Sequence, residues 1–457
     1  MSDSAGLIVR QATDHIAWIC QSKPQLSNVK GPITADRFIS HVKALASHLP
    51  DKQYCINLCD NRYLFMVSLC AIILREQTNL FPSNKTPETQ RLLFQRYDEC
   101  YVIHDGDQEI DDALDHIEID QSHLADSNPL EDNFEVPLIS LDHIAAIIFT
   151  SGSTGESKPI IKTWRTMVDS TSINQRYMQP DTSRTSYCLA TVPGQHMWGF
   201  ETSVLMPLFK NVCAADSRPL YPLDVLDHLN ELPLPRTLIT TPFHIKSILH
   251  ANLADFKIDK VLIATAPLDQ SLAQQVEDRF STDLLEIYGA SEVGSMSIRS
   301  TAKTHLWTRF DKLNFIQNGN RTTTVSAQHL PEDIVLDDRL NIIDSDHFEL
   351  IGRSNDQIEI AGKRGSLQEI NAVLGRFEGV SDGVVIFPEQ DREVPRVVAL
   401  VVFNDGVSKE DLRQYFRRFF DSAFVPRPIL EITQLPRLEN GKLSKPEILK
   451  LYKSLIK

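Results

Sequence analysis

Short apolar runs rich in β-branched residues alternate with amphipathic stretches over about three quarters of this chain. The apolar runs predict strands, at residues 144–149, 187–192, 237–240, 260–264 and 284–287. Residues 223–232 and 271–280 have helical spacing. Because strands that alternate with helices build helix-covered parallel sheets, the pattern predicts an α/β fold. At 457 residues, the chain is too long for a single hydrophobic core.

The pattern changes near residues 352–356, after a strand predicted at residues 347–351. A compact mixture of helices and strands follows. Ser366 and Glu369 form a capping pair that predicts a helix running through residue 377, and Ser408 can cap a second helix over residues 409–420. Strands are predicted at residues 384–387 and 396–403, and Pro446 suits the first turn of a last helix. The sequence therefore predicts a large α/β domain over residues 1–353, with mixed sheets and packed helices, and a small α+β domain over residues 354–457.

Charge and cysteine content narrow the classes of function. The chain has 46 basic and 61 acidic residues, and its net charge is −15. This negative charge argues against nucleic acid and anionic membranes as partners. Residues 1–10 lack the pattern of a secretory signal, and apolar stretches such as residues 64–74 are too short for a membrane span. The seven cysteines form no CxxC pair, so we expect reduced thiols in a cytoplasmic protein. The acidic residues 105–132 predict a surface excursion.

A loop rich in glycine and hydroxyl residues follows the strand predicted at residues 144–149. It contains Thr150, Ser151, Gly152, Ser153, Thr154, Gly155 and Lys158. Glycines let the backbone turn and expose N–H groups, while hydroxyls and an ammonium can face anionic oxygens, so the loop can hold phosphates. It is no Walker A motif, because Lys158 precedes a proline instead of serine or threonine. The alternative is an ordinary exposed turn.

Three further signals are weak when taken singly. Residues 288–292 offer a tyrosine ring for a purine, a hydroxyl for a phosphate and a carboxylate for Mg²⁺, or form an ordinary turn. Asp338 and Arg353 can both hydrogen-bond a ribose diol, or are surface charges. An Asn-Gly turn before Lys442 would present that lysine at a tip, where most lysines are simply solvated.

Taken together, these residues resemble the AMP-forming adenylating superfamily. It contains acyl- and aryl-CoA synthetases, adenylation domains of nonribosomal peptide synthetases and beetle luciferases. The matching positions, in family order and at about family spacing, are residues 150–158 and 288–292, Asp338, Gly352, Arg353, Gly362, Glu369, Gly441 and Lys442. The resemblance covers about residue 30 to the C-terminus and is closest to stand-alone acyl- or aryl-acid–thiol ligases.

The resemblance implies a role for each matching residue. Residues 150–158 would grip the ATP phosphates, and Ala264, Thr265, Ala266 and Pro267 would replace the family's Gly-Gly-Ala-Pro shelf beside adenine. Tyr288 and Gly289 would face adenine, Ser291 would bind the α-phosphate, and Glu292 would ligate Mg²⁺. Asp338 and Arg353 would hold the ribose, and Lys442 would bridge the substrate carboxylate and the α-phosphate.

Other positions concern the acyl group and the second half-reaction. His196 resembles a family histidine beside the acyl pocket, or is a structural core histidine. Asn355 would be the hinge between the domains, and Gly362 would let a pantetheine arm pass. Arg364 would meet a carrier phosphate or be a solvated arginine, while helix capping alone explains Glu369. Glu359 replaces a lysine common in the family, which leaves the acceptor open.

The resemblance implies ATP-dependent activation of a carboxylic acid as acyl-adenylate, with pyrophosphate release and transfer to a thiol. The acid would be aromatic or a short or medium acyl chain, and the acceptor CoA or the phosphopantetheine of a separate acyl carrier protein. Alternatives are a catalytically silent nucleotide-binding protein or a stand-alone amino-acid adenylation enzyme. The absence of Gly-Lys-Ser/Thr disfavours a P-loop NTPase.

Overall fold

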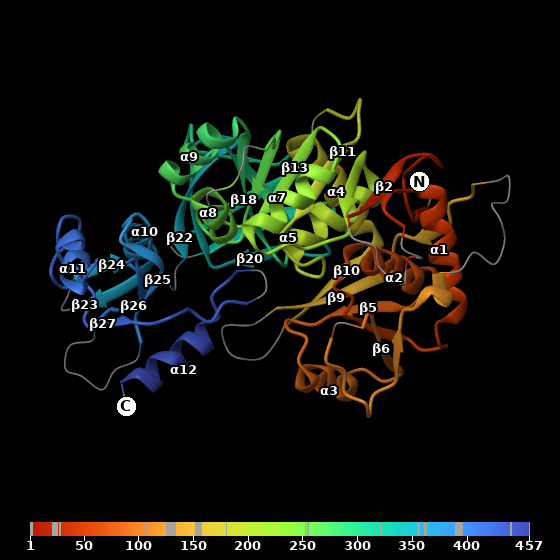
Figure 1. The fold of residues 1–457 in the computed structure, drawn as a ribbon, viewed down its shortest axis with the longest axis horizontal. Helices are drawn as coiled ribbons and strands as arrows, with labels where there is room; N and C mark the ends of the chain where they lie inside the picture. The colour runs from red at the N-terminus through yellow and green to blue at the C-terminus, as the bar shows by residue number, and fades with distance from the viewer. Residues whose placement is uncertain are drawn as a thin grey trace.

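Two large sheets carry most of the chain before residue 354 (Figure 1). The computed structural model describes residues 3–20, 26, 29–106, 108–124, 134–150, 158–179, 181–251, 253, 256–319, 322–353, 357–360, 363–388, 396–438 and 441–456. All statements below concern these residues.

The first sheet has six strands in the order β10-β9-β5-β4-β6-β7. Their bounds are β4 (Tyr54–Asn57), β5 (Thr78–Phe81), β6 (Cys100–His104), β7 (His116–Glu118), β9 (Ile144–Thr150) and β10 (Lys158–Thr163). All pairs are parallel except β9–β10. Its helices are α1 (Ala35–His48), α2 (Arg62–Leu74) and α3 (Pro87–Arg96). The parallel pairing confirms the α/β prediction for this region.

The second sheet has eleven strands in the order β21-β22-β17-β16-β15-β14-β13-β11-β12-β2-β3. Their bounds are β2 (His15–Ile19), β3 (Gly31–Thr34), β11 (Ser186–Ala190), β12 (Val212–Ala215), β13 (Arg236–Thr240), β14 (Lys260–Ile263), β15 (Asp283–Ala290), β16 (Gly294–Arg299), β17 (Trp307–Arg309), β21 (Asp338–Ile342) and β22 (His347–Arg353). The strands from β15 to β2 are parallel, and antiparallel strands extend both ends.

Helices cover both faces of the parallel strands. On one face, α7 (Pro222–Glu231), α8 (Pro242–His250) and α9 (Gln270–Phe280) share an apolar core with the sheet. On the other lie α4 (Trp164–Met178), α5 (Met197–Phe200), the π-helical turn η3 (Glu201–Leu205) and α6 (Met206–Phe209). Helix α2 is buried on all sides and contacts β4 and β5 of one sheet and β12 of the other, so it joins the two sheets.

The remaining elements before residue 354 are small. They are β1 (Ser4–Gly6), β8 (Leu138–Ser140), η2 (Gln121–Leu124) and the three-stranded sheet of β18 (Leu313–Asn318), β19 (Thr322–Ala327) and β20 (Ile334–Leu336). All seven cysteines are free and buried, as expected.

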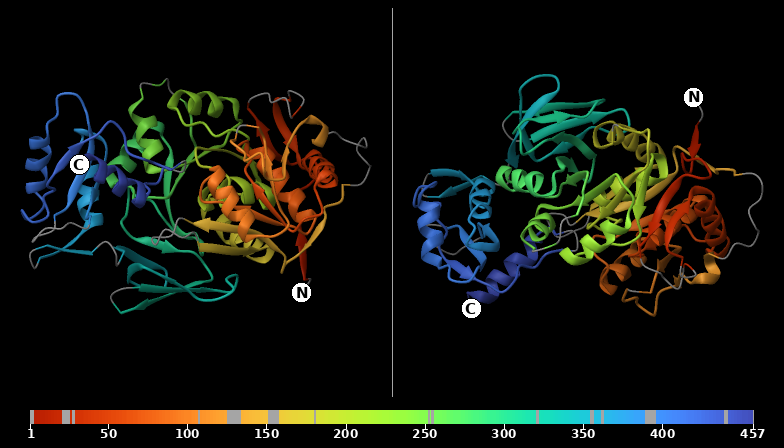
Figure 2. Two further views of the ribbon diagram at one scale, coloured as in Figure 1. Left: turned by 90° about the horizontal axis from the view of Figure 1, so that it is seen from below. Right: turned by 45° about the horizontal axis from the view of Figure 1, so that its top comes forward.

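The C-terminal elements form a separate lobe, drawn in blue in Figures 1 and 2. They are β23 (Gln357–Ile360), β24 (Lys363–Ser366), α10 (Leu367–Gly375), β25 (Val380–Ile386), β26 (Val398–Phe403), α11 (Lys409–Arg417), β27 (Ile429–Glu431) and α12 (Lys445–Leu455). Their two apolar clusters contain only residues from 358 onward. The predicted class, a large α/β part with a small α+β part, is thus confirmed; the boundary at residue 354 stays a prediction.

Three predictions about local structure need correction. Residues 105–132 are more than a surface excursion, because β7 completes the six-stranded sheet and Ile119 is fully buried. The strand predicted at residues 284–287 continues to Ala290, so Tyr288 lies within β15. Helices α10 and α11 end at Gly375 and Arg417, earlier than predicted, although Ser366 and Ser408 cap them as expected.

The separate cores predict separate stability. Phe416 is fully buried at the centre of one C-terminal cluster, so Phe416→Ala should destabilise that lobe by about 3–5 kcal/mol. Hydrogen exchange followed by mass spectrometry should show lost protection in β25 and β26 but not in β13 and β14. The half-exposed Phe419 gives the matched control Phe419→Ala, which should change little. Equal loss of protection in both sheets would contradict independent cores.

Candidate functional site

Six of the predicted site residues lie where parallel strands end. The shelf residues 264–267 follow β14, residues 191–196 follow β11, and the segment that begins α8 follows β13. Tyr288 lies near the end of β15, beside β14. Because the carboxyl ends of neighbouring parallel strands share one edge of a sheet, the fold brings these segments together.

Ser291 and Glu292 lie at the tip of the hairpin between β15 and β16. The amide of Val293 donates to the Ala290 carbonyl at 3.1 Å and closes this three-residue connection. The side chain of Glu292 is exposed there. The hairpin therefore presents a hydroxyl and a carboxylate side by side.

The Tyr288 ring connects β15 to the antiparallel end of the sheet. Its centroid lies 5.8 Å from Trp307 and 6.1 Å from Phe348. In the backbone register of β21 and β22, Asp338 is directly opposite Arg353. Two residues that are fifteen positions apart in the sequence are therefore opposite each other, as a shared ribose would require.

The shelf contains a strained residue. Thr265 has φ of +86°, in the left-handed region that a β-branched residue rarely adopts. The end of the shelf is fixed by buried Glu286, which accepts a hydrogen bond from the Leu268 amide at 3.0 Å. Glu286 also forms an ion pair with Arg299 at 2.7 Å. The shelf thus keeps a backbone shape that favours glycine although its glycines are replaced.

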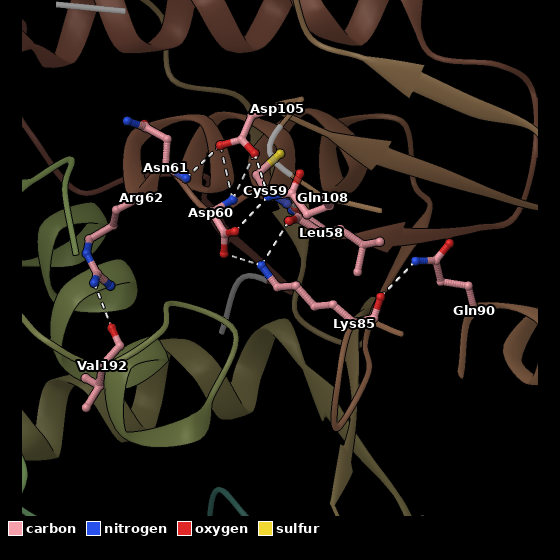
Figure 3. A network of polar contacts seen from close by, with 11 residues as sticks. Leu58, Cys59, Asp60, Asn61, Arg62, Lys85, Gln90, Asp105, Gln108 and Val192 are labelled. Atoms are coloured by element: carbon pink, nitrogen blue, oxygen red, sulfur yellow. Dashed lines mark hydrogen bonds and ion pairs between the residues drawn. The ribbon is translucent and has the colours of Figure 1, made fainter. Parts of the chain in front are cut away.

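Buried Arg62 supports the segment that leads to His196. Its guanidinium donates to the Val192 carbonyl at 2.8 Å (Figure 3). It also donates to the Ala190 carbonyl at 3.3 Å and to the Ser203 hydroxyl. The residue begins α2, which follows the end of β4. The Arg62 side chain therefore joins the end of β11, in the eleven-stranded sheet, to the helix that follows β4 of the six-stranded sheet.

A polar network joins the strand ends of the six-stranded sheet (Figure 3). Lys85 donates to the Leu58 carbonyl at 3.0 Å and pairs with Asp60, which also accepts from Gln108 at 2.8 Å. Asp105 accepts from the amides of Asp60 and Asn61. The loops after β4, β5 and β6 are thus tied to one another at the edge where β9 also ends.

The turn that carries Lys442 docks on the N-terminus of α8. A Cβ atom on Gly441, whose φ is +75°, would lie 3.3 Å from the Thr241 hydroxyl. The Arg437 guanidinium lies 4.4 Å from the centroid of the Phe243 ring and pairs with Asp382. This contact brings the C-terminal lobe to the strand ends of the central sheet.

The charge of Lys442 acts on His196. Burial, together with the positive charges of Lys442, Arg218 and Lys85, lowers the pKa of His196 to about 3. His196 is therefore a neutral imidazole at physiological pH. The two residues come from segments far apart in the sequence, and the fold brings them within electrostatic range.

Two buried charges lie beneath the Glu292 hairpin. The Lys162 ammonium donates to the Glu292 carbonyl at 2.9 Å, and Glu201 accepts from the Ser295 amide at 3.0 Å. Burial lowers the pKa of Lys162 to about 8, against the opposing effect of both carboxylates. Burial also raises the pKa of Glu201.

The remaining predicted residues belong to the phosphate loop, the hinge and the first strands of the C-terminal lobe. Ser151, Gly152, Ser153, Thr154, Gly155, Asn355 and Gly362 lie outside the described residues. The strands that flank the predicted phosphate loop are described, and Thr150 pairs with Lys158 across β9 and β10. In the backbone register of β23 and β24, Glu359 is opposite Arg364.

The donor set at the hairpin tip suits Mg²⁺ delivered with a nucleotide. Mg²⁺ prefers oxygen ligands and is commonly held by one or two carboxylates together with substrate phosphates. The exposed carboxylate of Glu292, beside the hydroxyl of Ser291, fits that pattern. Among the described residues, no group of three or more His, Cys, Asp or Glu side chains is arranged to hold a metal ion. Nor does any helix described here have the length and apolar character needed to span a membrane.

Sequence reasoning missed the residues that support the site. Lys162, Glu201 and Arg62 are charged side chains within or at the start of stretches rich in apolar residues, and each is at most 2% exposed. A lone charge in a run that is otherwise expected to be buried is the signal that could have found them. Arg437 and Phe243 carried no such signal, because their contact depends on how the lobes meet.

Comparison with known proteins identifies the family. The sequence model of the AMP-binding enzyme family matches residues 46–322, and the chain belongs to that family. Over 308 residues it is 22% identical to 3,4-dihydroxybenzoate–[aryl-carrier protein] ligase from Bacillus anthracis, covering 65% of this chain and 71% of the relative. The fold is similar to that of ATP-bound MatB from Rhodopseudomonas palustris, with a TM-score of 0.80, 15% identity and 98% of each chain covered.

A shorter similarity concerns a much larger protein. Over 98 residues the chain is 33% identical to a dimodular nonribosomal peptide synthase from Bacillus subtilis (strain 168). This match covers 21% of this chain and 4% of the relative, so the chain spans only a small part of that protein.

The buried His244 predicts a pH dependence of stability. Its Nδ1 lies 3.0 Å from the Thr191 hydroxyl, and burial, together with Arg218 and Arg437, lowers its pKa to about 4. The unfolded chain therefore binds more protons between about pH 6.5 and pH 4, and stability falls as pH falls through this window. His244→Asn, which can keep the Nδ1 contact, should lose about 2 kcal/mol less than the wild type over this range.

The measurement is urea denaturation from pH 7 to pH 4. His250, exposed at the end of the same helix, gives the matched control His250→Asn. Parallel pH profiles for the wild type and His244→Asn would show that His244 does not carry this dependence.

Proposed function

We propose that this enzyme activates a carboxylic acid with ATP and transfers the acyl group to a thiol. The observation that carries the proposal is the docked Lys442 turn, whose charge acts on His196 beside the strand ends of the central sheet. A cation at this place can neutralise two reactants that are both anionic. Membership in the AMP-binding enzyme family supports the nucleotide.

In the first step, a carboxylate oxygen attacks the α-phosphorus of ATP, and the bond to the bridging oxygen of pyrophosphate breaks. Lys442 would neutralise the carboxylate and the α-phosphate, and Ser291 would donate to that phosphate. Asp338 and Arg353, opposed across β21 and β22, would hold the ribose. Tyr288 and the shelf at Thr265 would position adenine, and residues 150–158 would hold the remaining phosphates. When bound to Glu292, Mg²⁺ would supply positive charge to the phosphate oxygens.

In the second step, a thiol sulfur attacks the acyl carbonyl, AMP leaves and the thiol proton is released. The B. anthracis relative is an aryl-carrier protein ligase, which supports an aromatic acid and a phosphopantetheine thiol. CoA carries the same thiol arm and remains the alternative acceptor. His196, a neutral imidazole, would line the acyl site.

Replacing the proposed catalytic lysine tests the first step. Lys442→Ala should slow acid-dependent ATP–pyrophosphate exchange about 100-fold or more, because it removes a charge aimed at the reacting groups. ATP affinity, measured by calorimetry, should change little. Lys445 is an exposed lysine three residues further on, and Lys445→Ala should leave both quantities unchanged. Full exchange by Lys442→Ala would contradict the assigned role.

A substrate panel tests the function itself. ATP–pyrophosphate exchange should respond to one class among benzoates, cinnamates, short- and medium-chain fatty acids and amino acids. With the responsive acid, thioester formation on CoA or on a phosphopantetheinylated aryl carrier protein identifies the acceptor. An enzyme that binds ATP but catalyses no exchange with any of these acids would contradict the proposal. Release of ADP and phosphate would indicate an NTPase.

A further inference from the structure

Two buried, oppositely charged residues, Lys162 and Glu201, contact the β15–β16 hairpin, which carries the proposed metal ligand Glu292. Lys162 belongs to β10, the strand that starts at Lys158, and Glu201 belongs to the π-helical turn η3. Neither side chain takes part in the proposed chemistry. A buried charge is costly unless other groups satisfy it, so the contacts of this pair indicate what it is for.

Lys162 reaches across to the tip of the β15–β16 hairpin. Its ammonium donates to the main-chain carbonyl of Glu292 at 2.9 Å. The carboxylate of the same residue is exposed on the outside. Glu292 is therefore held through its carbonyl from within the protein, while the residue itself is exposed.

Glu201 holds the other side of the same hairpin. Its carboxylate accepts from the Ser295 amide at 3.0 Å and from the Ser295 hydroxyl at 2.7 Å. Gly294, with φ of +106°, leaves room for the carboxylate, since a Cβ atom there would overlap Glu201 Oε1. The negative charge of Glu201 also opposes the lowering of the Lys162 pKa by burial.

We propose that Lys162, which holds the hairpin from one side while Glu201 holds it from the other, is a positioning residue that sets the position of the Glu292 carboxylate relative to the strand leaving the phosphate loop. The inference rests on the proposed function, because it takes Glu292 as the Mg²⁺ ligand. Residues behind a metal ligand commonly change metal affinity or activity by about 10- to 100-fold when replaced.

The test is direct binding of ATP to Lys162→Met, measured by calorimetry with Mg²⁺ and again with EDTA. We expect the Kd for MgATP to rise about tenfold, and the Kd for metal-free ATP to stay within about twofold. Lys210, a partly buried lysine that donates to the Ser172 hydroxyl in α4, gives the matched control Lys210→Met. An equal change in both affinities, or none, would overturn the proposal.

A double variant separates positioning from folding. Lys162→Met leaves Glu201 without its cation, so the single variant can lose stability for that reason alone. Lys162→Met with Glu201→Gln removes both charges, and the glutamine can still accept from Ser295. If the double variant regains wild-type thermal stability and MgATP binding stays weak, Lys162 is a positioning residue. If both recover together, its role is structural and the proposal is wrong.

Failure of the proposed function is a distinct result. An enzyme that binds MgATP but catalyses no acid-dependent exchange would contradict the proposed reaction, while the binding comparison would still decide the role of Lys162.

Discussion

The direction of the parallel strands is the constraint on which the rest of this structure depends. Six neighbouring strands of the central sheet are parallel, as are five of the first sheet, so their following loops gather at shared edges. The apolar helix α2 fixes the two sheets against each other by contacting both. The predicted phosphate, adenine and acyl segments all follow strands of these sets.

Buried charges then fix details that apolar packing leaves open. Arg62 ties the end of β11 to the first sheet, Glu286 holds the shelf exit, and Lys162 and Glu201 hold the Glu292 hairpin. Each charge bonds at least one main-chain group, whose position it therefore specifies. Apolar contacts would stabilise these segments as well but would tolerate small shifts, because they lack directionality.

Contacts between the lobes differ from those inside them. The Arg437 guanidinium lies over Phe243, Arg376 pairs with Asp269 at 2.6 Å, and Lys246 donates to the Val380 carbonyl at 3.5 Å. The apolar clusters of the C-terminal lobe contain no residue from the larger part. Polar contacts over separate cores are typical of interfaces between domains of one chain.

The sequence by itself determined the α/β class, the strands that lead into the site, the capped helices α10 and α11 and the association of Asp338 with Arg353. These follow from local periodicity, capping chemistry and the order of the motifs. Only the tertiary structure decided that Tyr288 continues β15, that Lys442 comes within electrostatic range of His196, and that Lys162 supports Glu292. Each of these depends on contacts between distant segments, and such contacts are set by how sheets and lobes pack, which no local pattern encodes.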